Sequence, residues 1–200
     1  MIRIDDQGAK RTITLDRPDK ANALTADMLS ALHDAIVAAK SNVIVLTGAG
    51  KVFCAGADLD AAKAGLAVSP LWEALSSAIA KSPAMTVAAL NGTLAGGAFG
   101  MALACDLRIA AAHANFFYPV MKLGFLPQPS DPPRMAALTG PSAAKRILLG
   151  GDKITAAEAL RIGLVDEICD AADLSTRVDA LTADAQAATS SHVAGIKALF

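Results

Sequence analysis

The chain has few residues of the kinds that mark several functional classes. Only 18% of its 200 residues are charged, and 18 lysines and arginines nearly balance 19 aspartates and glutamates. Without a positive field or a basic run, capture of nucleic acid is not indicated. The three cysteines are Cys54, Cys105 and Cys169. Their odd number and wide spacing favour neither a disulfide scaffold nor a zinc knuckle, so we expect buried free thiols in a reducing cytoplasm.

Metal-ligating histidine pairs are also lacking, and a leader segment is not expected. The three histidines, His33, His113 and His192, are isolated and have no metal-ligand spacing. We therefore predict no metal site and ordinary structural roles for these side chains. Residues 1–6 lack the apolar core of a signal peptide, so we expect a cytoplasmic protein.

Two glycine-rich segments fail the standard tests for phosphate binding. A P-loop needs a glycine five residues before Gly50-Lys51 and a serine or threonine after it, but Val45 and Val52 occupy those positions. The glycines at 92, 96, 97 and 100 do not fit the dinucleotide spacing G-x-G-x-x-G. A G-x-S-x-G nucleophile elbow is also missing. No nucleotide cofactor is therefore predicted.

Apolar residues make up 54% of the chain, enough for a sizeable core in one domain. The segment Pro83–Cys105 has no charged side chain and is long enough to span a bilayer. However, Asn91-Gly92 interrupts it and further glycines follow. We interpret it as a buried strand, a turn and a buried helix, with a membrane span as the alternative.

The periodicity of apolar residues predicts an alternating α/β pattern. Ile2–Ile4 and Ile13–Leu15 alternate with polar residues on either side of Gln7-Gly8, which predicts an antiparallel hairpin. Thr25 is placed to cap a helix. Strands and helices then alternate, which favours a largely parallel sheet with right-handed crossovers, and the last third is helical. The further expected elements are strands Val43–Leu46, Thr86–Leu90 and Leu107–Ala110, helix Leu71–Lys81, and a helix from the capping box Thr155–Glu158 to Gly163.

Several short segments occur in an order and at separations typical of one family. They are Asn22–Thr25, Leu46–Leu59, Asn91–Gly100, Cys105–Ala110, Leu123-Gly124, Gly140–Ser142, Ala156–Ala159 and Gly163–Val165. Together, from about Arg17 to Ile168, they resemble the crotonase (enoyl-CoA hydratase/isomerase) family. The resemblance implies an α/β fold of the ClpP/crotonase type, a spiral of ββα units. It implies a single domain over residues 1–200, with a core of about 1–168 and a shortened helical part of about 169–200.

The two glycine-rich loops have a chemical rationale within that resemblance. A thioester that loses an α-proton, adds water or loses carbon dioxide passes through an enolate, whose oxyanion needs preorganised donors. In the family two backbone N–H groups supply them, and the matching residues are Ala57 and Gly97. Glycine at a helix start lets a ligand approach free N–H groups closely. From the residues alone, the small residues of Gly96–Gly100 fit tight helix packing equally well.

The resemblance also implies a binding site for coenzyme A. Lys20 and Ala21 are expected to border the CoA tail, although Lys20 also fits a solvated loop lysine. The remaining residues assigned to this site are Ala55, Gly56, Asp58, Leu59 and Gly96. Plain packing is an equal alternative for the Ala21 and Leu59 side chains. No cofactor beyond the CoA moiety of the substrate is implied.

The family's two catalytic glutamates have no counterpart in this chain. One lies three residues after the oxyanion glycine, where this sequence has Gly100. The other follows a proline, four residues before the Leu-Gly loop glycine, where Pro119 is followed by Val120. Neither glycine nor valine can accept a proton, so hydration by the two-carboxylate route is not expected.

Two other side chains near the second position are candidates for proton transfer. Asp131 is the only carboxylate close to that loop, in the proline-rich segment Pro127–Arg134, and it also fits a turn aspartate ahead of a proline. Tyr118, the only tyrosine, is placed to donate a proton or to line the acyl pocket, with apolar packing as the alternative. The four prolines predict a rigid loop with few backbone donors.

These observations leave two functions open. The first is an enzyme that acts on a CoA thioester through an enolate without the usual glutamates, by decarboxylation, isomerisation or thioester cleavage. The second is a catalytically inactive protein that binds or senses acyl-CoA. The family implies a homotrimer or hexamer. It usually continues past the helix ending near Lys197, so we expect a more open CoA site or one that a partner closes.

Overall fold

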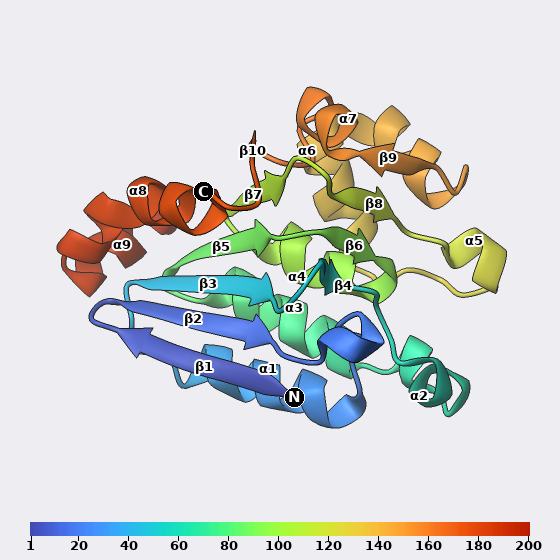
Figure 1. The fold of residues 1–200 in the computed structure, drawn as a ribbon, viewed down its shortest axis with the longest axis horizontal. Coiled ribbons are helices and arrows are strands. Elements are labelled where there is room, and N and C mark those ends of the chain that lie inside the picture. The colour runs from blue at the N-terminus through green and yellow to red at the C-terminus, as the bar shows by residue number, and fades with distance from the viewer.

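The computed structural model describes residues 1–200 and contains two sheets with helices packed around them (Figure 1). A six-stranded sheet has the order β1-β2-β3-β5-β7-β10, and a four-stranded sheet has the order β4-β6-β8-β9. The strands are β1 (Ile2–Gln7), β2 (Lys10–Leu15), β3 (Val43–Gly48), β4 (Val52–Cys54), β5 (Met85–Leu90), β6 (Thr93–Ala95), β7 (Leu107–Ala111), β8 (Asn115–Phe117), β9 (Lys153–Thr155) and β10 (Glu167–Cys169).

Helices follow most of the strands along the chain. The α-helices are α1 (Ala26–Val37), α2 (Leu59–Lys63), α3 (Leu71–Lys81), α4 (Phe99–Ala104), α5 (Val120–Leu123), α6 (Asp131–Leu148), α7 (Ala156–Arg161), α8 (Leu174–Ala187) and α9 (Ser190–Lys197). The 3-10 helices are η1 (Pro18–Lys20), η2 (Leu66–Val68) and η3 (Gly96–Ala98). The last two α-helices project to one side of the molecule in Figure 1.

The predicted hairpin, capped helices and parallel sheet are all confirmed. β1 pairs antiparallel with β2, so that Ile2 lies opposite Leu15, whereas β2, β3, β5, β7 and β10 pair in parallel. The Thr25 side chain accepts a hydrogen bond from the Met28 N–H and begins α1. Thr155 accepts in the same way from the Glu158 N–H at α7.

Both faces of the central strands β3, β5 and β7 are buried, as is usual in a parallel sheet, whereas the edge strand β1 is largely exposed. Because side chains alternate along a strand, Ile44 and Leu46 of β3 join the main core with residues of α1, α3 and α4. Val43 and Val45 face the other way and pack in a second core with Leu174 of α8. These two cores hold the ends of β3 and β5 in fixed positions.

The uncharged segment Pro83–Cys105 lies inside the protein. It forms β5, β6, η3 and α4, and its one α-helix has six residues. None of the helices has both the length and the apolar character needed to cross a membrane.

The structure differs from the sequence-based expectation in its second sheet and in the proline-rich segment. The strands of the second sheet have three residues each, too short for a clear period of two, and the sequence analysis placed none of them. The segment Pro127–Arg134 was expected to be a rigid loop. Instead α6 begins at Asp131, because Pro132 and Pro133 fit the first helical turn, where the N–H group has no partner in any case.

Candidate active site

The two predicted loops lie directly against each other. One leaves β3 and contains β4 and Gly56, and the other leaves β5 and ends at η3. A Cβ atom added to Gly56 would lie 3.0 Å from the Ala95 carbonyl oxygen and 3.6 Å from the Gly97 nitrogen. Gly56 also has a φ of 96°, which side-chain-bearing residues rarely adopt. Glycine at this position therefore allows the loops to meet.

The backbone leaves the Ala57 N–H without a protein acceptor. Leu24 and Ala57 form an isolated parallel bridge, in which the Leu24 N–H donates to the Gly56 carbonyl and the Asp58 N–H donates to the Leu24 carbonyl, both at 2.8 Å. The Ala57 N–H between these two bonds donates to no backbone group. It is a free donor at the edge of the loop.

Gly97 supplies the other N–H group that the sequence analysis singled out. It is the second residue of η3, and first-turn N–H groups have no acceptor inside their own helix. A Cβ atom added to Gly97 would lie 3.3 Å from the Trp72 ring, so the indole packs closely against this residue. The Trp72 ring is itself held by a hydrogen bond from Nε1 to the Leu66 carbonyl.

A cavity of about 150 Å³ lies between these loops and the segment after β8. Most of its lining is apolar, and no lysine, arginine, aspartate or glutamate contributes to it. Seven predicted site residues line it: Ala55, Ala57, Leu59, Gly96, Gly97, Tyr118 and Val120. The other predicted residues lie outside the lining: Lys20, Ala21, Gly56, Asp58, Gly100 and Asp131.

Ala21 contacts the site through its backbone. Its carbonyl accepts a hydrogen bond from the Ala55 N–H at 3.0 Å. Ala21 and Asn22 both have left-handed backbones, with φ of 49° and 54°. Buried Asn22 holds this turn, because its side chain accepts from the Arg17 N–H and donates to the Ala49 and Val52 carbonyls. The sequence analysis did not identify Asn22 as a support for the site.

Asp58 is occupied by structural contacts. Its side chain caps α2 by accepting from the Asp60 and Ala61 N–H groups, and it accepts from Arg17 Nη1 at 2.7 Å. The hydrogen bond from the Arg17 guanidinium lowers the pKa of this carboxyl. Its visible role is to fix the loop that carries Ala57.

The space beside Gly100 contains the carboxyl of Asp131. A Cβ atom added to Gly100 would lie 3.0 Å from Asp131 Oδ1 and 3.6 Å from Ser76 Cβ. Asp131 is fully buried as the first residue of α6, so it lies at a helix start and not in a turn. A glutamate at position 100 would therefore meet an existing carboxyl. Val120, at the other expected glutamate position, begins α5 and lines the cavity.

Tyr118 and Asp131 form a hydrogen-bonded pair at the cavity wall. The Tyr118 hydroxyl donates to Asp131 Oδ2 at 2.8 Å, and its ring stacks on Phe99 with a centroid distance of 5.2 Å. Asp131 Oδ1 is buried without a partner. Burial raises the pKa of Asp131 to about 7. Burial and the nearby Asp131 carboxyl also raise the pKa of Tyr118.

The comparisons with known proteins agree with this architecture. The family model of enoyl-CoA hydratase/isomerase matches residues 7–200. The chain belongs to this family. It is 38% identical to the putative enoyl-CoA hydratase/isomerase YngF of Bacillus subtilis, over 86% of this chain and 70% of that protein. It is 34% identical to a crotonyl-CoA hydratase of Syntrophomonas wolfei, over 88% of this chain and 72% of that protein. The crystal structure of an enoyl-CoA hydratase from Bacillus anthracis superposes with a TM-score of 0.89 at 29% identity, covering 98% of this chain and 80% of that one.

In this member of the enoyl-CoA hydratase/isomerase family, the carboxyl next to Gly100 comes from a different helix. The helix position three residues after Gly97 has no side chain, and a carboxyl from the start of α6 occupies the neighbouring space. The sequence analysis could not find this proximity, because Gly100 and Asp131 are 31 positions apart in the chain. No group of three or more histidine, cysteine, aspartate or glutamate side chains converges on a metal-sized site.

The raised pKa of Asp131 predicts a loss of stability with rising pH. The folded state holds this proton up to pH of about 7, whereas the unfolded state releases it near 3.8, so the free energy of unfolding should fall between these values. The difference corresponds to about 4 kcal/mol at most. Urea denaturation at pH 5 and pH 8 should show that Asp131→Asn removes this dependence, whereas the exposed-site control Asp184→Asn keeps it. Equal pH dependence in Asp131→Asn and the unaltered protein would contradict this prediction.

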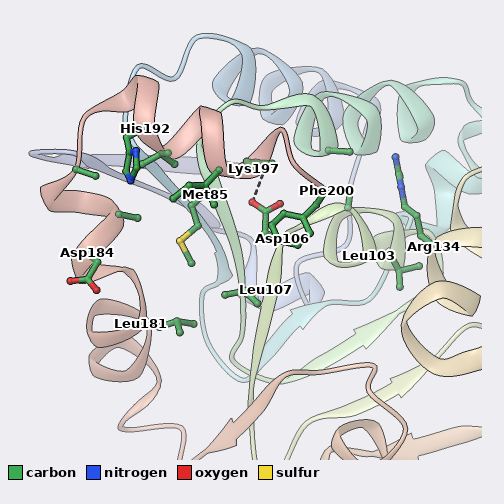
Figure 2. Close-up of a pocket in the computed structure, with 16 residues that line it drawn as sticks. Met85, Leu103, Asp106, Leu107, Arg134, Leu181, Asp184, His192, Lys197 and Phe200 are labelled. Atoms are coloured by element: carbon green, nitrogen blue, oxygen red, sulfur yellow. Dashed lines mark hydrogen bonds and ion pairs between the residues drawn. The ribbon is translucent and has the colours of Figure 1, made fainter.

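A larger cavity of about 1020 Å³ lies between the C-terminal helices and the main body (Figure 2). Side chains of α8 and α9 line one side, and Met85, Leu103 and Leu107 line the other. Lys197 Nζ donates to Asp106 Oδ2 at 2.8 Å across it. None of the predicted site residues lines this cavity, so it is separate from the loops described above.

Proposed function

We propose that this protein binds an acyl-CoA thioester and catalyses a reaction through its enolate. The Ala57 and Gly97 N–H groups act as oxyanion donors, and the Tyr118–Asp131 pair carries the proton. The observation that carries this proposal is the Asp131 carboxyl beside Gly100, bonded to a tyrosine that lines the cavity. The family relationship supports coenzyme A as the carrier of the acyl group.

The donor geometry supports stabilisation of an oxyanion. Ala57 and Gly97 both line one small apolar cavity, and Ala57 has a free N–H. Donors fixed in a low-dielectric site act strongly on a developing negative charge because they need no reorganisation during the reaction. The neighbouring CoA-binding role of Ala55, Gly56, Leu59, Gly96, Lys20 and Ala21 remains part of this proposal. No cofactor other than the CoA moiety is required.

The Tyr118–Asp131 pair supports proton transfer at neutral pH. With a pKa of about 7, Asp131 exists in both protonation states near neutrality, which suits a group that serves as acid and base. Tyr118 lines the cavity and Asp131 does not, so in this proposal the Tyr118 hydroxyl carries the proton between Asp131 and the substrate. When the α-carbon of the enolate takes the proton of the Tyr118 hydroxyl, protonated Asp131 gives its own proton to the Tyr118 oxygen. In the reverse direction, Tyr118 takes a proton from the α-carbon and its hydroxyl proton passes to ionised Asp131.

Decarboxylation of a malonyl-type thioester fits this site best. Loss of carbon dioxide leaves the bonding electrons on the enolate, so no base is needed, and the Tyr118–Asp131 pair then protonates the α-carbon. The cavity lining has no cation that would stabilise the charged carboxylate of the substrate, so its loss as neutral carbon dioxide is favoured.

Other functions use the same site. Isomerisation of a double bond uses the Tyr118–Asp131 pair as base and then acid, and thioester cleavage is a further candidate. An inactive acyl-CoA-binding protein is the second candidate function, favoured by Gly100 and Val120 in place of two glutamates.

A panel of acyl-, enoyl- and malonyl-type CoA esters tests this proposal. We expect conversion of a malonyl-type or enoyl ester, detected by mass spectrometry, and no hydration of crotonyl-CoA above the uncatalysed rate. Hydration with a turnover of about 1–10³ per second would contradict the prediction. Binding of several esters without conversion would instead support the acyl-CoA-binding protein. Light scattering on the same sample would test the homotrimer or hexamer that the family suggests.

A further inference from the structure

We propose that Glu73, Ser130 and Arg134 form a charge-balancing network that positions Asp131 and sets when it holds its proton. This inference rests on the proposed role of Asp131 in proton transfer. Glu73 lies on α3, Ser130 directly precedes Asp131, and Arg134 lies one turn later on α6. These three are positioning residues, because none of them lines the thioester cavity.

The hydroxyl of Ser130 joins the two charged side chains. Ser130 Oγ donates to Glu73 Oε2 at 2.9 Å and accepts from Arg134 Nη1 at 2.8 Å. The Ser130 backbone N–H also donates to Glu73 Oε2 at 3.3 Å. Because Ser130 directly precedes Asp131 in the chain, these contacts fix the backbone from which the Asp131 carboxyl projects.

The two charges act on Asp131 in opposite directions. The charged groups close enough to act on its carboxyl are Arg134 from α6 and Glu73 from α3, both hydrogen-bonded to the neighbouring Ser130. The segment after β8 presents the neutral Tyr118, and α4 presents Gly100. The Arg134 guanidinium favours the ionised carboxyl and lowers its pKa, whereas the Glu73 carboxylate disfavours a second negative charge and raises it. Burial is the main cause of the raised pKa of Asp131, and these two charges modify that pKa in opposite directions.

Arg134 also connects this network with the larger cavity. Figure 2 shows its side chain at one end of that cavity, away from the Lys197–Asp106 pair. The network therefore borders the larger cavity, and not the smaller cavity between the two loops. Changes to Glu73 or Arg134 can alter the charge around Asp131 without obstructing the thioester.

Removal of each charge separately gives opposite expected results. The Asp131 carboxyl can be followed by ¹³C NMR titration, with its signal assigned by loss in Asp131→Asn. Arg134→Gln should raise the midpoint and Glu73→Gln should lower it, each by about 0.5–1 pH unit. The double variant should return close to the original midpoint, and Arg134→Lys, which keeps the charge, should shift it least. The pH–rate profile of any reactive CoA ester should move in parallel.

A remote ion pair of the same composition supplies the control. Glu167 and Arg177 join β10 to α8, so Glu167→Gln and Arg177→Gln remove equal charges at a distance from Asp131 and should leave its midpoint unchanged. The network would be overturned if Glu73→Gln and Arg134→Gln shifted the titration midpoint of Asp131 in the same direction. Midpoints that stay within about 0.2 pH unit of the original value would overturn it as well. If no ester reacts, the proposed function fails, but the NMR titration still decides this inference.

Discussion

Asp131→Asn should lower the turnover of the reactive CoA ester by about 10²–10⁴-fold, the usual contribution of a positioned acid or base. The asparagine keeps an oxygen that can accept from the Tyr118 hydroxyl, so the side-chain shape and the 2.8 Å hydrogen bond can persist. It cannot hold or release the proton at neutral pH. The KM should change little, because Asp131 does not line the cavity. Steady-state kinetics of the purified variant would measure both constants.

Tyr118→Phe tests whether the two side chains act as one unit. It removes the hydroxyl but keeps the ring that stacks on Phe99. If the proton passes through both groups, the double variant should lose about as much activity as the more impaired single variant. The exposed Asp60→Asn is a matched control near the site and should retain full turnover. Full activity in both Asp131→Asn and Tyr118→Phe would show that neither carries the proton.

Loss of the Ala57 N–H should lower turnover by about 10²–10³-fold, the cost of one oxyanion donor. Ala57→Pro removes this donor without adding charge. The donor makes no bond within the protein, so its loss should leave the backbone bonds around Leu24 intact. Turnover should fall much more than affinity, because the thioester ground state carries less negative charge than the enolate. Single-turnover kinetics and direct titration with a non-reactive acyl-CoA would separate the two effects.

The proline ring can also strain the loop, so a second variant isolates the donor. Replacing Ala57 by its α-hydroxy analogue exchanges the N–H for an ester oxygen and adds no ring. Thermal unfolding of both variants would show whether the fold is retained. Unchanged turnover and unchanged binding in a correctly folded ester variant would remove the support for an oxyanion role of Ala57.

Much of the fold could be predicted from local patterns in the sequence. The hairpin between Ile2 and Leu15 and the helix Leu71–Lys81 appeared where periodicity placed them. The signal of the helix is strong because one of its faces is buried and the other is exposed. The three-residue strands of the second sheet were missed, since β4 and β9 are too short to show any period. Their pairing is decided by neighbours distant in the chain.

The sequence by itself determined the family and the two loops, because its short segments from Asn22–Thr25 to Gly163–Val165 occur in the order and at the separations typical of that family. It also determined that the expected glutamates are missing at Gly100 and Val120. Only the tertiary structure decided what lies in the space beside Gly100. Packing of α6 against α4 buries Asp131 there and pairs it with Tyr118. Burial raises the pKa of this carboxyl and the hydrogen bond from Tyr118 partly offsets that rise, and neither effect is a property of its neighbours in sequence.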